Sequence, residues 1–525
     1  MSSLVIAVPA LVLFFLAYKF YAGKLERLWH IDKGRQTPAF SRFDKIDYVP
    51  AKNWLVLFGH HFSSIAGAGP IIGPVIAVAL WGWLPALLWV VIGTIFIGGT
   101  HDYGSLITSI REGGSSVADI AHHAISRRAK ILFSLFVWLA LILVIAVFAY
   151  LCAETFVKEP KIVAPSLGLI PVAMLVGYLL YHLRVNSAIA TALGLALFLG
   201  LIFLGNSFTI KSSMAVWLAV LFIYSYFASI MPVNILLQPR DYLSSFLLFF
   251  GVGAGYAGLL ISRPVINTPY FYQWSSAGGN LWPALFVTVA CGAVSGFHSL
   301  IASGTSSKQI ASEGHVKRVG YGGMVAEGVV AVLAIIAATT LFGQGGASRG
   351  ASPIEIFGKG FGLLTNGILG GYGGFIAITI LNAFILTTLD TATRISRYLT
   401  EELTGIKNRY LSTLLIVIIS AGLAFSGKWN KIWPAFGASN QLVAALALFV
   451  LSCWLLSRNK SVKFTFPPAV FMLVTTIAAL AAQAVTYFKS GDFLLFGVDV
   501  CLISLAGFMV VEVTRAILIR RKKHA

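Results

Sequence analysis

The sequence predicts an all-α integral membrane protein. Of its 525 residues, 58% are hydrophobic and only 11% are charged, whereas globular domains are about 45–50% apolar and about 25% charged. The apolar runs are long enough to cross a bilayer and lack the period-2 alternation of barrel strands. These observations predict one polytopic domain over residues 1–525, with about fifteen transmembrane helices.

The expected helices follow the apolar runs in chain order. The first is expected to be a retained, peripheral helix, because its charges follow the apolar stretch and do not precede it as in a secretory signal. The last two, within 465–518, are also expected to be peripheral. The spans cover approximately residues 3–21, 53–80, 84–110, 130–156, 163–182, 186–205, 213–232, 241–261, 281–303, 320–342, 369–392, 410–427, 434–456, 465–488 and 493–518.

The positive charges predict the orientation. With the N-terminus outside, the cytoplasmic segments hold 28 of the 38 Lys and Arg residues, the outer segments hold 9, and Lys19 closes the first span. Such a bias is typical of cytoplasmic loops, so the C-terminus is expected in the cytoplasm. The net charge of +19 therefore reflects topology and does not indicate a nucleic-acid partner. The four cysteines lack metal-ligand spacing, and no phosphate-binding GxxxxGK[ST] pattern occurs.

The second span is interrupted near its middle. Proline lacks an N–H, and the backbone groups freed by such a break must find partners inside the protein or in water. A helix broken at mid-membrane predicts a binding site, with a simple packing kink as the alternative. The candidate substrate- or ion-binding residues around this break are His60, His61, Ser63, Ser64, Gly67, Ala68 and Gly69.

The ninth span is the second candidate for a broken helix. Gly59, His61 and Gly67 share their spacing with Gly296, His298 and Gly304. The two spans have opposite predicted orientations, as an inverted repeat requires. The candidate binding residues here are Ser295, His298 and Ser299.

Several charged residues near the ends of spans are candidates for coupling or gating. Each has a structural alternative: an interfacial charge, an ordered corner, or a static clamp. Within 369–392 and just beyond, Asp390 and Arg394 are spaced as an i,i+4 pair. Glu327 is a further intramembrane carboxylate, expected to bond helices together. The aromatic loop 262–280 is read as an outer vestibule or as an interfacial belt. The coupling candidates are Asp102, Arg240, Asp241, Asp390 and Arg394.

Five segments resemble the carbon starvation protein A family of prokaryotic transporters. They are FGHHFSSIAGAGPIIGP, GTHDYG, LLQPRDYL, SGFHSLIASGTSSKQ and TTLDTATR, spread over roughly residues 45–400. The resemblance implies a secondary transporter of the cytoplasmic membrane for peptides or pyruvate, induced under nutrient limitation.

The same resemblance implies a LeuT-like core of two inverted five-helix repeats over residues 53–456, with an insertion. On that analogy span two pairs with span nine, or in an alternative register with span seven. Thr387 and Thr391 would face the first break, where Ala66, Thr387 and Thr391 could hold sodium.

The expected activity is ion-coupled uptake of a carboxylate-bearing nutrient by alternating access. Half-helix N-termini suit a carboxylate, and protons are preferred over sodium because histidines with Asp102 or Asp390 can titrate. Peptide and pyruvate stay open as substrates, and so does the oligomeric state. A signalling or channel protein is the rival class, and a membrane enzyme is disfavoured because no HExxH or GxSxG motif occurs. No cofactor is expected, and the partners are the substrate, the ion and the bilayer.

Overall fold

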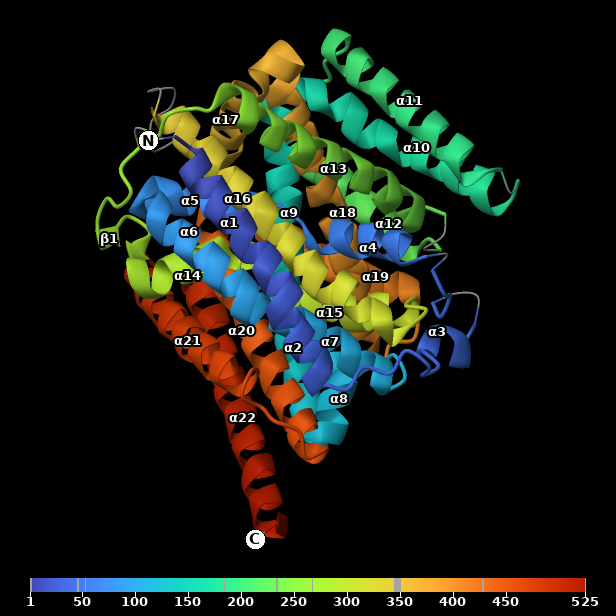
Figure 1. The fold of residues 1–525 in the computed structure, drawn as a ribbon, viewed down its shortest axis with the longest axis vertical. Helices are drawn as coiled ribbons and strands as arrows, with labels where there is room; N and C mark the ends of the chain where they lie inside the picture. Colours follow the sequence, from blue (N-terminus) through green and yellow to red (C-terminus); the bar gives the residue numbers. More distant parts are fainter. Residues whose placement is uncertain are drawn as a thin grey trace.

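Helices make up most of the computed structural model (Figure 1). It describes residues 2–44, 47–51, 53–183, 185–232, 235–266, 268–343, 351–426 and 429–524. The labels η1 to η9 mark short 3₁₀ or π-helical turns. The chain begins with α1 (Leu4–Leu16), η1 (Ala17–Tyr21), α2 (Ala22–Leu28), α3 (Pro38–Ser41), α4 (Trp54–Ile65), α5 (Gly69–Trp81), α6 (Trp83–Ile92), η2 (Gly93–Gly98), α7 (Gly99–Arg111), α8 (Val117–Ala124) and α9 (Arg127–Lys158).

The middle of the chain contains the second broken segment and a two-stranded hairpin. Its elements are η3 (Pro160–Ile162), α10 (Val163–Tyr181), α11 (Ser187–Ser207), α12 (Met214–Ile230), α13 (Leu237–Ser262), β1 (Ser275–Ser276), β2 (Gly279–Asn280), η4 (Leu281–Leu285), α14 (Phe286–Val289), η5 (Ala290–Gly292), α15 (Gly296–Gly304), η6 (Ser306–Lys308), η7 (Glu313–His315) and η8 (Lys317–Tyr321). The last part forms α16 (Gly322–Gly343), α17 (Pro353–Leu369), η9 (Gly370–Tyr372), α18 (Gly373–Thr404), α19 (Arg409–Phe425), α20 (Trp429–Ser457), α21 (Phe466–Lys489) and α22 (Phe493–His524).

The lengths of the helices confirm an all-α membrane fold. Among the described residues, 12 helical stretches are long and apolar enough to cross a membrane, or up to 13 if the bent pair α4–α5 counts as one span. The helices α12 and α19 correspond to two of the expected spans, but each has only 17 residues. The count of about fifteen spans therefore stays a prediction.

The predicted break in the second span is confirmed. Asn53 caps α4 by accepting the N–H of Val56 at 2.9 Å, and α4 ends at Ile65. The next helix, α5, has Pro70 in its first turn, where the missing N–H would have had no helical partner. The two helices are bent by 45°, and Ala68 between them is fully buried.

The ninth span is also broken, and the break lies just before Gly296. The turns η4, α14 and η5 end at residue 292, and α15 begins at Gly296. Ala290 at this break has a positive φ of 34°, a conformation uncommon for residues other than glycine. His61 therefore precedes its break, whereas His298 follows its own, so the spacing shared by the two segments does not superpose the breaks.

The two breaks lie against each other. A Cβ on Gly69 would lie 2.5 Å from the Cβ of Cys291, and a Cβ on Gly73 would lie 2.5 Å from the carbonyl oxygen of Thr288. Only glycine permits backbones to approach this closely, as at other tight helix contacts. The segment that crosses the first break is thus the ninth span, one of the two counterparts considered from the sequence.

One helix, α17, was not expected, because its residues were read as part of an external loop. Its apolar residues Ile354, Phe357, Phe361 and Leu364 recur at helical spacing and are buried, against α16 and α18. The side chain of Lys359 is 56% exposed on another face. An amphipathic helix of this kind has a mean hydropathy too low to be read as a span.

The aromatic loop packs over the turn between α5 and α6. The N–H of Leu84 donates to the carbonyl of Tyr270, and the N–H of Tyr272 donates to the carbonyl of Trp81, each at 3.0 Å. The hairpin β1–β2 follows directly. The loop therefore closes over one end of the broken second span.

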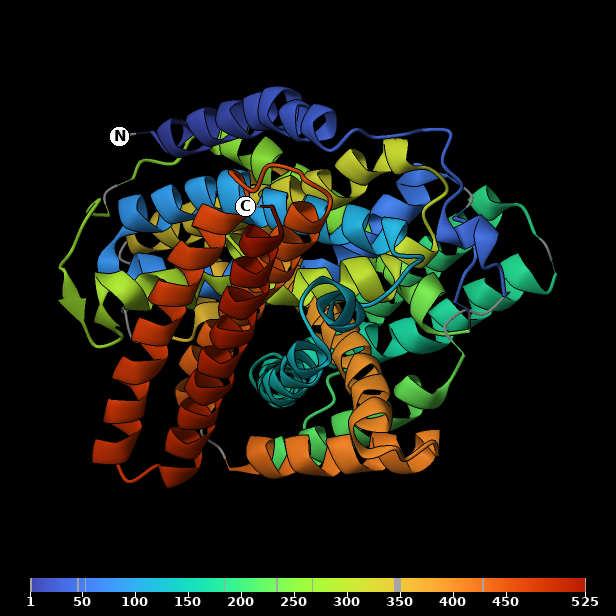
Figure 2. The same ribbon diagram turned by 90° about the horizontal axis from the view of Figure 1, so that it is seen from below.

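Several helices lie at the edge of the molecule. Figure 1 shows the α10–α11 hairpin along one side and α22 extending beyond the rest of the bundle. In Figure 2, α1 runs along the outer surface. These positions leave the two broken segments in the interior.

Candidate substrate and coupling site

The first break faces α18 through Thr388. A Cβ on Gly67 would lie 2.6 Å from Thr388 Oγ1, and this buried hydroxyl has no hydrogen-bond partner among the described residues. Thr387 instead donates its hydroxyl proton to the carbonyl of Ala383 at 3.0 Å. The expected helix faces the break, but the hydroxyl closest to Gly67 belongs to Thr388, with Thr391 about one turn further along.

The two helix N-termini at the breaks are capped differently. At α15, Asn440 Oδ1 accepts the N–H of Phe297 at 2.9 Å, and Asn440 Nδ2 donates to Ser295 Oγ at 3.1 Å. At α5, the capping position is Ala68, whose methyl group accepts no hydrogen bond. The partial positive charge of the α5 N-terminus is therefore not met by a capping side chain, an arrangement suited to a carboxylate ligand.

A chain of titratable side chains lies beside the crossing of the breaks. Asp102 on α7 accepts from two imidazoles, His101 Nδ1 at 2.7 Å and His298 Nδ1 at 2.8 Å. On the other side of the His298 ring, Nε2 lies 3.0 Å from Glu327 Oε2 on α16, at ion-pair distance but without the alignment of a hydrogen bond. All four residues are fully buried. A buried charge persists only when it is paired in this way.

His61 on α4 approaches the same chain. Its Nδ1 lies 2.7 Å from Ser306 Oγ, while its Nε2 has no hydrogen-bond partner among the described residues. A Cβ on Gly323 would lie 3.5 Å from that Nε2. Because Gly323 and Glu327 are one turn apart on α16, His61 packs against the face of α16 that carries Glu327.

A second buried cluster surrounds Arg240. This residue donates from Nη1 to Asp390 and to the hydroxyl of Tyr224, and Tyr224 donates to Asp390 at 2.6 Å. Asp241 lies 3.5 Å from Arg240 Nη2 and 3.4 Å from His60 Nδ1. The cluster therefore connects α12, α13 and α18, and reaches α4 through His60.

Arg394 does not pair with Asp390, contrary to the expectation from their i,i+4 spacing. Its Nη2 donates to the carbonyl oxygens of Ala228 at 2.7 Å and Met231 at 2.5 Å, at the C-terminal end of α12. Asp390 instead takes Arg240 as its partner. A cation at a helix C-terminus is stabilised by the free carbonyls, so Arg394 caps α12.

The candidate serines make mainly local bonds. Ser64 donates to the carbonyl of His60 at 2.8 Å, and Ser299 donates to the carbonyl of Gly296 at 2.7 Å. Ser63 differs because it donates to the backbone carbonyl of Asp241 at 3.1 Å. This bond is a second connection between α4 and α13.

Two residues in these clusters received no role from the sequence, and a third received a different one. Tyr224 is followed by Ser225 and Tyr226 on α12, and Thr388 lies beside Thr387 on α18, so the sequence does not distinguish one hydroxyl from its neighbours. Glu327 was recognised as an intramembrane carboxylate and read as a helix-bonding residue. Its burial beside His298 was the missing information, since the two are 29 positions apart in the sequence.

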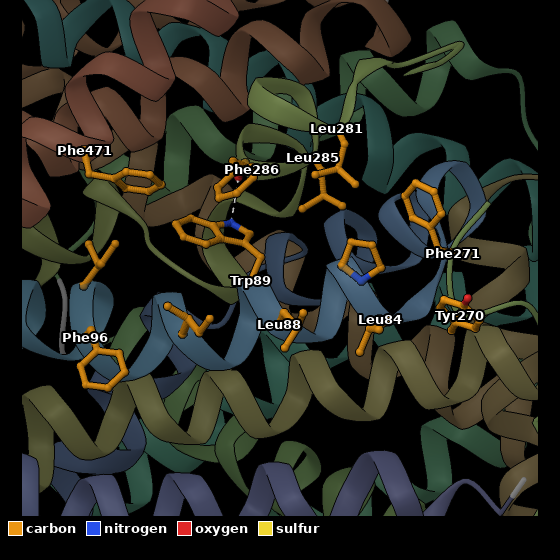
Figure 3. Close-up of a pocket in the computed structure, with 13 residues that line it drawn as sticks. Leu84, Leu88, Trp89, Phe96, Tyr270, Phe271, Leu281, Leu285, Phe286 and Phe471 are labelled. Atoms are coloured by element: carbon orange, nitrogen blue, oxygen red, sulfur yellow. Dashed lines mark hydrogen bonds between the residues drawn. The ribbon is translucent and has the colours of Figure 1, made fainter. Parts of the chain in front are cut away.

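A separate apolar groove of about 710 Å³ lies between α6, η4, α14 and α21 (Figure 3). Trp89 lines the groove and donates from Nε1 to the carbonyl of Phe286 at 3.1 Å. None of the residues in the two polar clusters lines it. Exposed apolar residues such as Leu88 and Phe96 border the groove, as on a surface that faces lipid.

Comparisons with known proteins agree with this architecture. The family described as Carbon starvation protein CstA matches residues 2–360 and 343–479. The peptide transporter CstA of Campylobacter jejuni is 30% identical, over 91% of this chain and 79% of that protein. The peptide transporter CstA of Escherichia coli is 29% identical, over 91% and 80%. The pyruvate/proton symporter BtsT of Escherichia coli is 29% identical, over 92% and 82%.

Among solved structures, a mutant of the Eremococcus coleocola manganese transporter has a similar fold, with a TM-score of 0.54 and 12% identity over 90% of this chain and 99% of that chain. This likeness concerns the fold alone. The matched relatives are transporters and not enzymes. With the family match over most of its length, this chain is a multi-pass membrane transporter that belongs to the carbon starvation protein CstA family.

Proposed function

We propose that this chain is a secondary transporter that takes up peptides across the prokaryotic cytoplasmic membrane, driven by protons. Pyruvate is the alternative substrate, since relatives of similar identity are named for either compound. The proposed orientation places the N-terminus outside and the C-terminus in the cytoplasm, following the distribution of Lys and Arg. The structural core is proposed to be a LeuT-like inverted repeat between residues 53 and 456.

The observation that carries this proposal is the contact between the two helix breaks. Gly69 and Cys291 bring the broken segments together at the uncapped N-terminus of α5. Thr388 adds a hydroxyl without a partner among the described residues. A peptide C-terminus and pyruvate both carry a carboxylate, which is the group that such an N-terminus favours.

The residues around the break are buried, so the substrate must reach them through movement of the surrounding helices. The half-helix α4 is tied to α13 by Ser63 and by the proximity of His60 to Asp241. It is tied to η6 by His61 and Ser306. We propose that release of these contacts opens the break to one side of the membrane, as in alternating access.

Protons are the preferred coupling ion because titratable side chains lie beside the crossing, with Asp102, His298 and Glu327 in contact. Sodium near Ala66, Thr387 and Thr391 remains the alternative. There, backbone carbonyls and hydroxyls would supply the oxygen ligands that hard cations take.

Uptake by proteoliposomes tests the proposal. Radiolabelled alanylalanine and pyruvate are offered under an imposed pH gradient, and then under a sodium gradient without a pH gradient. We expect accumulation only under the pH gradient. Equal accumulation under sodium alone would overturn proton coupling, and transport of neither compound would overturn the proposed substrate class.

A further inference from the structure

Asp102, His298 and Glu327 form a buried triad, and His101 also contacts Asp102. Neutral His101 and His298 have too few N–H groups to donate in every contact. The chain has three polar contacts: His101 to Asp102, Asp102 to His298, and His298 to Glu327. An ionised carboxylate only accepts, and a neutral imidazole has one N–H and one lone pair. Neutral His101 and His298 would therefore fill the first two contacts only.

The third contact consequently needs a proton of its own. With its Nδ1–H directed to Asp102, neutral His298 would present the lone pair of Nε2 to Glu327 Oε2 at 3.0 Å. Two acceptors at this distance repel each other, and both residues are fully buried, so water does not screen them. One further proton, on either His298 Nε2 or Glu327, removes the conflict.

We propose that this further proton, shared by His298 and Glu327, is the coupling proton of the transporter. This inference rests on the proposed proton-driven function and assigns its site. In one form the proton is on His298 Nε2, between two carboxylates. When it passes to Glu327 Oε2, the imidazole becomes neutral and the carboxyl group becomes uncharged. The triad has a charge of −1 in both forms and −2 once the proton has left.

The position of Glu327 connects the proton to the substrate region. Both of its carboxylate oxygens lack a hydrogen-bond partner among the described residues, and it lies one turn before Ala331, whose Cβ would be 3.0 Å from a Cβ on Gly292 at the second break. Loss of the proton would therefore leave an unpaired negative charge close to the proposed carboxylate site. Proton and anionic substrate would then favour each other, which is the requirement for symport.

The side chains that surround the triad do not offset the charge of Glu327 without a further proton. They are His61 on α4, His101 on α7 and Cys291 on η5, while α20 contributes the amide of Asn440. None of them supplies a fixed positive charge. In the other buried cluster, by contrast, Asp390 is paired with Arg240, which stays charged at every relevant pH.

The decisive variant is Glu327→Gln, tested by transport of alanylalanine and pyruvate in proteoliposomes. For one proton per substrate, a gradient of about one pH unit supports about tenfold accumulation by the unchanged protein. We expect the accumulation ratio of Glu327→Gln to fall to about one, with exchange of labelled for unlabelled substrate at equal pH retained. Accumulation by this variant to the level of the unchanged protein would overturn the proposal.

The matched control is Asp499→Asn. Asp499 on α22 is also fully buried, and neither of its carboxylate oxygens has a hydrogen-bond partner among the described residues. It lies outside the two clusters. We expect this variant to keep the accumulation ratio, so that loss in Glu327→Gln reflects its position and not the removal of any buried carboxylate. Equal loss in both variants would count against the assignment.

A second measurement does not depend on transport. The infrared difference spectrum of the purified protein between acidic and alkaline buffer reports a proton lost from either His298 or Glu327. We expect Glu327→Gln to remove one component that Asp499→Asn retains. If the unchanged protein transports neither alanylalanine nor pyruvate, the proposed function fails. The infrared spectrum still tests the assignment of the proton to His298 and Glu327. Identical spectra for Glu327→Gln and the unchanged protein would overturn it.

Discussion

Replacing Asp390 by asparagine should destabilise the protein strongly, because it leaves a buried guanidinium without its main partner. Arg240 is 1% exposed and pairs with Asp390 through Nη1. Removing one member of a buried pair costs about 3–5 kcal/mol. Asp241 stays 3.5 Å from Arg240 Nη2 and compensates part of the charge. We therefore expect Asp390→Asn to lower the free energy of unfolding by about 3 kcal/mol.

The measurement is unfolding of the purified protein by sodium dodecyl sulfate, followed by tryptophan fluorescence. The control removes a carboxylate from an exposed pair: Glu355 and Lys359 are 43% and 56% exposed, and Glu355→Gln should cost at most about 0.5 kcal/mol. Arg240→Gln combined with Asp390→Asn should cost less than the sum of the two single changes, by about 2 kcal/mol. A cost of Asp390→Asn no larger than that of Glu355→Gln, or strict additivity, would refute the pairing.

Two further predictions concern the first break. A methyl group in Gly69→Ala would lie 2.5 Å from the Cβ of Cys291, so it should separate the two breaks and abolish uptake. The control is Gly507→Ala on α22, where a Cβ would have nothing within 4 Å, and it should leave uptake unchanged. Equal uptake by the two variants would contradict the close contact of the breaks. Thr388→Val should weaken substrate-dependent thermal stabilisation with little loss of stability, since its hydroxyl has no partner among the described residues. Thr393→Val, which removes a hydroxyl bonded to its own helix, should keep that stabilisation, and a normal response of Thr388→Val would exclude this hydroxyl from the site.

The sequence was sufficient for features that depend on local chemistry. The run of glycines and prolines around Gly69 forces a break in an apolar helix wherever that helix lies, and the bend of 45° confirms it. The second break was predicted in the correct segment, but the spacing shared with the second span did not superpose the two breaks. The observed break contains Ala290 at positive φ, and alanine gives no sign of such a conformation in the sequence.

The pairing of buried charges could not be predicted, because it depends on which helices are neighbours. Asp390 has Arg394 one turn away on its own helix, and only the packing of α13 against α18 shows that Arg240 is closer. The partner of Glu327 is likewise on another helix, because His298 belongs to α15. Periodicity and propensity describe one helix at a time, so they identify buried carboxylates without their partners.

The half-helix α4 connects the two buried clusters, and this connection would give the proposed coupling a structural basis. His60 lies 3.4 Å from Asp241, in the cluster that Arg240 holds with a fixed charge. The next residue, His61, bonds to Ser306 and lies against the face of α16 that carries Glu327. Any movement of α4 that opens the break must change both contacts at once. In our proposal only the Glu327 side holds an exchangeable proton. Loss of this proton changes the electrostatic interactions of α4 on that side, whereas the Arg240 cluster keeps its charge and its contacts with α4.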